Sequence, residues 1–248
     1  MKIGVIGTGN IGGTLARKLI AAGHEIRVAN SGGADAVRAF AEQIGAEPVD
    51  IRGAVDGTDV IVLSIPLPAT RALPADLFAS VPDSVPVVDT SNYYPGLRDP
   101  RIDEIDQGMT ESLWITKQIG RPVIKAFNNV LAYTLAQLGL PEGTEGRFAV
   151  AVAGDDRGAK ETVMSLVNQV GFDPVDGGSL AESWRQQPST PCYCCDYDAD
   201  TMRKALSLAV KGQAAANRDE LPRHFKWLGP NPSHEDVVAM NRSFNPLD

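Results

Sequence analysis

Short apolar runs alternate with longer amphipathic segments from Lys2 to about residue 153. The runs are apolar at consecutive positions, which is typical of parallel strands that are covered on both faces. They span Lys2–Ile6, Glu25–Ala29, Asp59–Ser64, Val85–Asp89, Pro122–Ala126 and Arg147–Ala153. This alternation predicts an α/β fold, in which a doubly wound parallel sheet carries helices on both faces.

The segments between these runs have the apolar spacing of helices. The clearest is Ile11–Ala22, where apolar residues form one stripe and Gly23 follows as a stop signal. Further helices are predicted over Ala34–Ile44, Ala69–Ala79, Thr110–Gln118, Asn129–Leu138 and Asp155–Val170. We expect Asp155 to cap the last of them.

The pattern changes after the apolar run Phe172–Val175. A stretch rich in Gly, Ser, Pro and Gln follows, then one predicted helix over Asp200–Asn217, and a tail punctuated by prolines from Leu221 onward. We therefore divide the chain into a domain of residues 1–178 and an extension of residues 179–248. The extension is expected to be a helical or irregular cap over the carboxyl ends of the strands, or a dimer arm.

The composition argues against a nucleic-acid-binding protein and against a membrane-spanning protein. Lys and Arg number 23 against 31 Asp and Glu, and the net charge of -8 disfavours nucleic-acid binding. No membrane span is expected, because no run reaches about 18 apolar residues, and the strand at the N-terminus leaves no room for a leader. Cys192, Cys194 and Cys195 suit reduced thiols better than disulfides or a metal site, which favours a cytoplasmic protein. A homodimer is the expected assembly.

The sequence Gly7-Thr8-Gly9-Asn10-Ile11-Gly12 matches G-x-G-x-x-G between an apolar strand and an amphipathic helix. In this context Gly7 permits the tight turn, Gly9 clears the approach of a diphosphate, and Gly12 lets the helix approach the strand. The helix N-terminus then offers free N–H groups to the phosphates. The motif predicts a Rossmann-type site for a nicotinamide dinucleotide.

The end of the second strand bears on the choice between NADP and NAD. An acidic residue there would accept hydrogen bonds from the ribose of NAD, but this chain has Asn30 and Ser31. Both can donate to a phosphate, and Arg38 follows in the next helix, so NADP is favoured. The alternative is that Asn30 and Ser31 only cap that helix.

Four segments together resemble the family of deazaflavin (coenzyme F420)-dependent NADP oxidoreductases and their NADPH-dependent bacterial relatives, from Met1 to about Gly178. They are GVIGTGNIGGTLARKLIAAGHEIRVANS, DVIVLSIPL, VVDTSNYYP and VIKAFNN. The resemblance implies a Rossmann domain with a small C-terminal extension, and hydride transfer between NADP(H) and a deazaflavin.

By position, the resemblance places Thr8, Gly9, Asn10 and Ile11 at the pyrophosphate, Asn30 and Ser31 at the adenosine ribose or its phosphate, and Ser64, Ile65 and Pro66 beside the nicotinamide. One position departs from the family. The family has an Arg after the Ser, whereas this chain has Gly32, which leaves NAD open. The long C-terminal extension leaves room for a different hydride partner.

Candidate chemistry lies in the loops after the strands, where open α/β sheets bind their ligands. Reduction of a carbonyl needs an acid, and Lys125 or Tyr93 could serve if burial lowered its pKa. The alternatives are a Lys125 ammonium that reaches solvent and a Tyr93 ring that packs on the core. Asn92 and Asn128 are candidate cofactor contacts.

Three functions are compatible with these features: an NADP(H)-linked reductase acting on a flavin-like or small carbonyl partner, an NAD-linked dehydrogenase of a small alcohol or aldehyde, and a dinucleotide-binding redox sensor. Trp184, Arg185 and Gln187 lie in a segment of little secondary-structure propensity. They are candidates for contact with a substrate or a second subunit.

Overall fold

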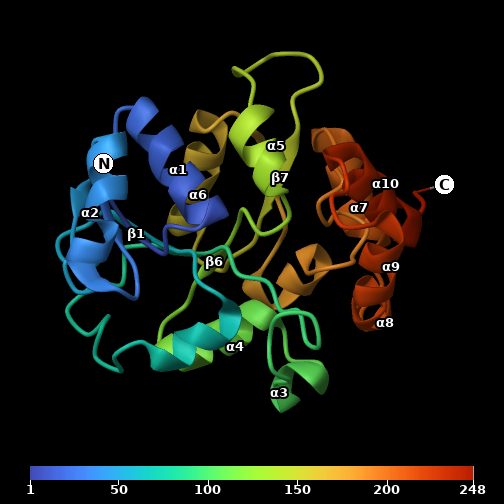
Figure 1. Cartoon of the computed structure of the whole chain (residues 1–248), viewed down its shortest axis with the longest axis horizontal. Helices are drawn as coiled ribbons and strands as arrows, with labels where there is room; N and C mark the ends of the chain where they lie inside the picture. The colour runs from blue at the N-terminus through green and yellow to red at the C-terminus, as the bar shows by residue number, and fades with distance from the viewer. Residues whose placement is uncertain (248) are drawn as a thin grey trace.

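The computed structural model describes residues 1–247 and has a six-stranded parallel sheet at its centre (Figure 1). The strand order is β3-β2-β1-β4-β5-β6. The strands are β1 (Lys2–Ile6), β2 (Glu25–Ala29), β3 (Glu47–Pro48), β4 (Val60–Leu63), β5 (Val87–Asp89) and β6 (Ile124–Lys125). The order reverses direction between β1 and β4, and ligands of this fold bind at such a switch point.

Two further strands extend the sheet beyond β6. β7 (Ala149–Val152) and β8 (Asp173–Asp176) pair in parallel with each other. A single antiparallel bridge between Lys125 and Ala153 joins β7 to β6, with reciprocal backbone hydrogen bonds of 2.8 and 3.0 Å. The expected doubly wound α/β fold is confirmed, and β3 is a short strand that the apolar pattern did not predict.

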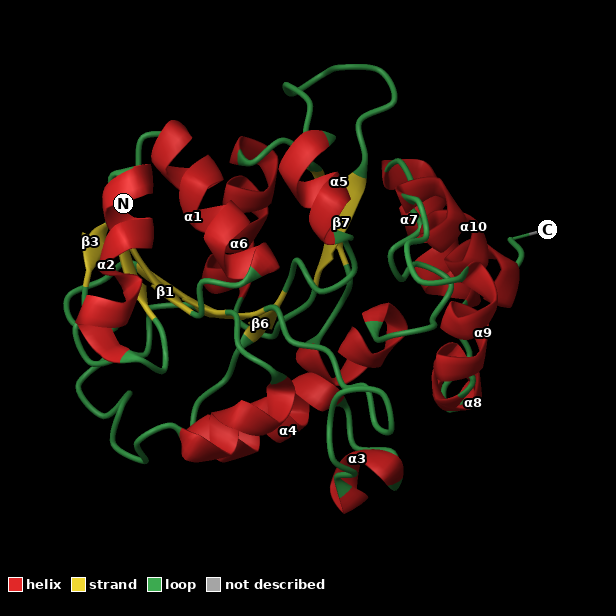
Figure 2. Cartoon of the chain, viewed as in Figure 1, coloured by secondary structure: helices red, strands yellow, loops and turns green. Residues whose placement is uncertain are grey.

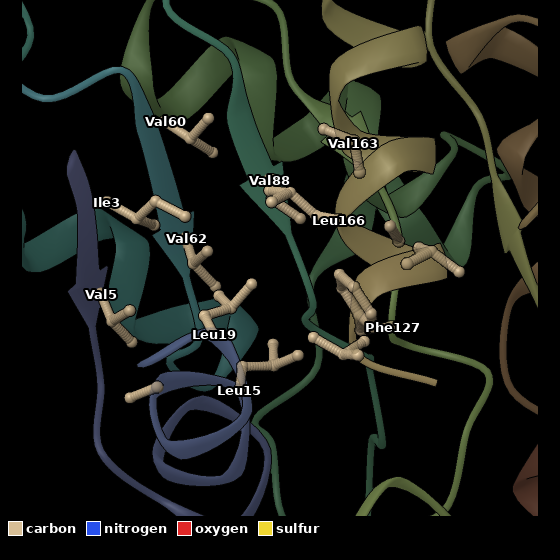
Figure 3. Close-up of a cluster of buried hydrophobic side chains, with 14 of the residues drawn as sticks. Ile3, Val5, Leu15, Leu19, Val60, Val62, Val88, Phe127, Val163 and Leu166 are labelled. Carbon is tan, nitrogen blue, oxygen red and sulfur yellow. The ribbon is translucent and has the colours of Figure 1, made fainter. Parts of the chain in front are cut away.

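Helices cover both faces of the sheet (Figure 2). One face packs against α1 (Asn10–Ala21), α2 (Gly33–Ile44) and α6 (Arg157–Gln169), and the other packs against α4 (Glu111–Ile119). Successive strand residues face opposite sides, so each apolar run supplies both cores. The core under α1 and α6 contains Ile3, Val5, Leu15, Leu19, Val60, Val62, Val88, Val163 and Leu166 (Figure 3).

Several helices begin or end at other residues than the sequence predicts. The helix expected over Ala69–Ala79 is a short 3₁₀ helix, η1 (Leu67–Ala72), followed by turns, because Pro74 has no N–H to continue it. α5 is shorter than expected, at Ala132–Gln137, and a short helix α3 (Asp103–Asp106) was not predicted. The cap of α6 is Asp156, which accepts from the Ala159 N–H at 2.7 Å.

The extension is more helical than the sequence suggested. Its elements are η2 (Leu180–Gln186), α7 (Ala199–Leu208), α8 (Gln213–Asp219), α9 (Leu221–Leu228) and α10 (His234–Phe244). The single helix expected over Asp200–Asn217 is broken, because Gly212 has a left-handed φ of 90°. α7 packs on β7 and β8 through a small core that includes Met202 and Leu206.

None of the helices within residues 1–247 combines the length and the apolar character that crossing a membrane requires.

Candidate cofactor and active site

The glycine turn after β1 is fixed by packing at two of its three glycines. Gly7 has a φ of 101°, which favours glycine, and a Cβ there would collide with the carbonyl oxygen of Ser64. A Cβ on Gly12 would collide with the carbonyl oxygen of Gly7. These two residues bring the start of α1 tightly against β1 and the end of β4.

Gly9 is a glycine for a different reason. Its φ of -72° is open to any residue, and a Cβ would meet no heavy atom within 4 Å among the described residues. The missing side chain leaves open space at the start of α1, where no side chain caps the first N–H groups. Such amides bind phosphate, and the positive end of the helix dipole favours it. This cradle fits the diphosphate of a dinucleotide.

The turn opens into a cavity of about 200 Å³ at the carboxyl ends of β4 and β5. Its wall is formed by Gly9, Asn10, Ile11, Ser64, Ile65, Pro66, Thr90, Ser91, Asn92 and Arg98. Seven of the predicted site residues therefore lie around one space, although they come from three separate loops. The Thr90 hydroxyl donates to the Ser64 hydroxyl oxygen at 3.0 Å and holds the two strand ends together.

A second cavity, of about 470 Å³, lies on the other side of the turn and includes Thr8, Gly9 and Asn10. It extends between α1 and α5, where Arg17 and Tyr133 line it. The phosphate cradle at Gly9 is thus reached from two sides.

The end of β2 forms a compact turn. The Asn30 side-chain oxygen accepts a hydrogen bond from the Gly32 N–H at 2.9 Å, while Ser31 is exposed. Arg38, the expected phosphate partner, is paired at 2.6 Å with Asp35 in the first turn of α2. The Asn30 side chain therefore closes the turn before α2 and does not cap the helix, whose N-cap is Gly32 with no side-chain hydrogen bond, so the capping alternative is wrong for Asn30. Arg38 has an acidic partner already.

Lys125 belongs to a buried ion cluster. Its side chain is 0% exposed, so the alternative in which its ammonium reaches solvent is wrong. The ammonium lies 3.1 Å from an Asp89 carboxylate oxygen, donates to the Ser91 carbonyl and lies 3.9 Å from a Glu111 oxygen. Lys125 does not line the cavity, and it acts on the cavity by holding the Ser91 backbone.

Glu111 is the member of this cluster that the sequence analysis missed. It is 1% exposed, and burial raises its pKa to about 7, opposed by the nearby cations Lys125 and Arg218. Asp89 is fully buried and accepts from the Ser112 hydroxyl at 2.7 Å and the Ser91 hydroxyl at 2.6 Å. The sequence did contain a signal for this cluster, because Asp89 ends an apolar strand and Glu111 stands at the start of a helix with apolar residues.

Tyr93 points into the core, as its alternative interpretation predicted. It is 0% exposed, its hydroxyl donates to Asp106 at 3.2 Å and it accepts from the Ile102 N–H at 2.7 Å. Burial raises the pKa of Tyr93, because desolvation disfavours the phenolate, so the expectation that burial would lower this pKa is wrong. Its hydroxyl anchors the loop before α3 and is not part of the cavity wall.

Asn92 and Asn128 bind each other across two loops. Asn128 donates to the Asn92 side chain at 3.0 Å and to the Gln186 carbonyl at 2.7 Å, while Asn92 donates to the Asn128 carbonyl at 2.9 Å. Asn128 is 2% exposed and lies behind the wall, so the structure places only Asn92 at the cavity. Gln186 also brings the start of the extension to the end of β6.

Arg98 is a wall residue that the sequence did not indicate. It donates to the Asn92 carbonyl at 2.6 Å and pairs with Asp99 at 2.8 Å, with a side chain that is 45% exposed. It is the one charged residue among those that line this cavity. Its guanidinium gives the outer wall a positive charge.

The three cysteines lie far inside the extension. All are buried free thiols, and burial raises the pKa of Cys192 and Cys195 to about 12. Thiols with such pKa values stay protonated at neutral pH and are poor nucleophiles and ligands. Within residues 1–247 they form no cluster suited to a metal ion.

Comparison with known protein families gives a match to the first part of the chain. Residues 2–93 match the protein-family model described as NADP oxidoreductase, coenzyme F420-dependent. The matched segment contains the glycine turn and the ends of β4 and β5, which form the cavity wall except for Arg98.

The chain is also similar to individual proteins and to solved structures. The protein YjhV of Escherichia coli (strain K12) is 57% identical over 106 residues, which are 43% of this chain and 77% of YjhV. The structure of a hypothetical protein, SMa0349 from Sinorhizobium meliloti, is 29% identical with a TM-score of 0.67, over 79% of this chain and 95% of that chain. A candidate F420-dependent NADP reductase from Arthrobacter sp. FB24 shares the fold, with 22% identity and a TM-score of 0.60 over 75% of this chain and 87% of that chain.

Proposed function

Because this chain belongs to the family of coenzyme F420-dependent NADP oxidoreductases, we propose that it transfers hydride between NADP(H) and a flavin-like second partner. Members of this family are NAD(P)-dependent oxidoreductases. The observation that carries the proposal is the single cavity that joins the phosphate cradle at Gly9 to the ends of β4 and β5. A dinucleotide laid across this switch point would bring its nicotinamide to Ser64, Ile65 and Pro66.

When bound, the nicotinamide supplies or accepts the hydride. The chain binds the diphosphate at the start of α1, and its backbone after β4 forms the floor on which a planar ring would lie. Arg98 provides positive charge at the wall, where it would stabilise negative charge that develops on the acceptor. Asn92 holds Arg98 through its carbonyl oxygen.

The residues that line the cavity favour a flavin-like ring over a carbonyl group as the hydride acceptor. None of the described residues that line the cavity is Asp, Glu, His, Lys, Cys or Tyr, and an Arg guanidinium does not release its proton. A carbonyl acceptor needs a proton donor for the developing alkoxide, whereas transfer to a ring needs mainly alignment. The burial of Lys125 and Tyr93 away from the wall supports the same choice.

The activity is tested by following the oxidation of NADPH with a panel of acceptors: a deazaflavin, FMN, a quinone and a short aldehyde. We expect turnover with the ring acceptors. Turnover with the aldehyde alone would favour the dehydrogenase alternative. Tight binding of NADPH with no turnover by any acceptor would favour a redox sensor.

We also propose NADP(H) as the cofactor. The absence of an acid at the end of β2 supports NADP, while Gly32 and the Arg38–Asp35 pair oppose it by leaving no free guanidinium there. Calorimetric titrations with NADPH and NADH decide between them. At least about tenfold tighter binding of NADH, which is about 1.4 kcal/mol, would overturn the choice of NADP.

We also propose a location and an assembly for the protein. The free thiols of Cys192, Cys194 and Cys195 support a reducing, cytoplasmic location. Exposed apolar side chains on the extension, among them Val210 and Trp227, support a homodimer.

A further inference from the structure

A third cavity lies away from the dinucleotide site, between α4, η2 and α8. In Figure 1, α4 lies below the sheet, on the face opposite to α1, and α8 lies at the lower right with the other helices of the extension. The cavity has a volume of about 120 Å³, which is close to the roughly 150 Å³ of an engineered cavity that holds benzene. It can therefore hold a molecule of only a few heavy atoms.

The inner wall carries a buried carboxyl group with no hydrogen bond on one oxygen. Glu111 lines the cavity and is 1% exposed, and its Oε2 has no hydrogen-bond partner among the described residues. The nearest cation, Lys125, is 3.9 Å from that oxygen and is already bonded to Asp89 and Ser91. A buried polar atom left without a hydrogen bond is costly, and a ligand in the cavity could satisfy it.

The remaining wall combines an apolar body with a positive rim. Ile105, Met109 and Trp184 supply apolar surface, and Lys211 and Arg218 line the side formed by the extension. Arg218 is paired with Asp219 at 2.9 Å and with Asp106 at 3.9 Å, whereas Lys211 is exposed and has no ion-pair partner among the described residues. The rim therefore suits an anionic group.

We propose that this cavity binds a small monocarboxylate, with its carboxylate at Lys211 and Arg218 and its short apolar or oxo-bearing body between Trp184 and Glu111. In this arrangement the protonated Glu111 carboxyl donates a hydrogen bond to the oxo oxygen of a ligand that carries one, such as pyruvate. The proposal stands independently of the proposed hydride transfer, because it concerns a different cavity. Glu111 nevertheless approaches the dinucleotide cavity through Lys125, which holds the Ser91 backbone.

The arrangement predicts that binding depends on pH. Glu111 faces Lys125 of β6, Asp89 of β5 and Arg218 of α8, and its pKa is raised to about 7. An ionised Glu111 would repel a carboxylate and could not donate a hydrogen bond. Affinity for the monocarboxylate should therefore fall as the pH rises through about 7, whereas affinity for an amine should rise.

The test is a titration of the unliganded full-length protein with pyruvate and butyrate, followed by the indole N–H signal of Trp184 in NMR spectra. The chain has three tryptophans, so a Trp184→Phe variant assigns the signal. We expect a saturable shift whose midpoint concentration increases from pH 6 to pH 8. Lys211→Ala should weaken binding by about two- to fivefold, as expected for an exposed ion pair, while Lys204→Ala on α7 should not change it.

Glu111→Gln is the second variant, because an amide can donate the same hydrogen bond but does not titrate. It should bind pyruvate with an affinity that no longer changes with pH. If this variant fails to fold, the pH series on the unmodified protein and the two lysine variants still decide the question. The absence of a saturable Trp184 shift, or tighter binding of butylamine than of butyrate at pH 6, where Glu111 is protonated, would overturn the proposal.

Discussion

Gly9 is the residue on which cofactor binding most directly depends. Its backbone has ordinary dihedral angles and a Cβ there would meet no heavy atom within 4 Å of the described chain, so Gly9→Val should fold normally. The valine side chain would occupy the approach of the diphosphate, and we expect binding of NADPH to weaken by at least about tenfold, or 1.4 kcal/mol. Calorimetry measures this, with Gly158→Ala on α6 as the control. Unchanged affinity would place the phosphates elsewhere.

Lys125 should matter more for stability than for chemistry. Lys125→Met leaves the carboxylates of Asp89 and Glu111 without their central cation in a buried site. Removing one partner of a buried ion cluster costs about 3–5 kcal/mol, so the urea midpoint should fall sharply. If instead the variant unfolds at the same urea concentration but loses turnover, Lys125 would be a proton donor after all.

Glu111 makes stability depend on pH in a definite direction. Its pKa is about 7 in the folded protein against the ordinary 4.5, so the folded state binds this proton more tightly than the unfolded state. The stabilisation that this provides is complete below about pH 4.5 and is lost as the pH rises through 7, by on the order of 3 kcal/mol. The stability difference between the unmodified protein and Glu111→Gln, measured by urea unfolding, should change by this amount. A constant difference would show that Glu111 is ionised throughout.

These residues also show what the sequence could and could not predict. The glycine turn is local, since six consecutive residues between a strand and a helix define it. Asp89 lies 36 residues before Lys125, and a sequence does not reveal whether a strand-end lysine meets such a partner or solvent. The partners of Tyr93 lie 9 and 13 residues away, across an irregular loop. Arg98 was missed because its place at the cavity depends on the path of one loop.

At the scale of elements, the two adjacent acids at the start of α6 have different roles. Asp156 caps the helix, whereas Asp155 accepts from the Leu180 N–H at 2.9 Å and ties η2 to the end of β7. Asp156→Ala should therefore lower the free energy of unfolding by about 1 kcal/mol and speed hydrogen exchange in the first turn of α6. Asp155→Ala should instead speed exchange at Leu180. If Asp155→Ala instead speeds exchange in the first turn of α6, Asp155 is the cap.

Elements with continuous apolar runs were predictable, because burial on both faces leaves a strong pattern. The extension was harder, since its prolines suggested irregular structure. In the structure three of them stand at helix starts: Pro222 lies in the first turn of α9, and Pro230 and Pro232 precede the Ser233 cap of α10. Proline is tolerated there because the first N–H groups of a helix have no intrahelical partner.

At the scale of the whole molecule, the net charge of -8 acts against the proposed homodimer, because two identical copies repel each other. The proposed contact surface is apolar, with Trp227 66% exposed on α9 and Val210 62% exposed before α8. Apolar contact persists in salt while the repulsion between exposed charges is screened, since the Debye length shortens to about 3 Å at 1 M ionic strength.

The dimer should therefore become tighter as salt is added, which is the opposite of an assembly held by surface ion pairs. Sedimentation equilibrium at low salt and at about 0.5 M sodium chloride measures the change. Trp227→Glu adds one negative charge to the apolar surface and should shift the protein to monomer at both salt concentrations. Gln43→Glu adds the same charge at an exposed position on α2 and should not. A dimer that weakens with salt, or that Trp227→Glu leaves intact, would place the contact on another face.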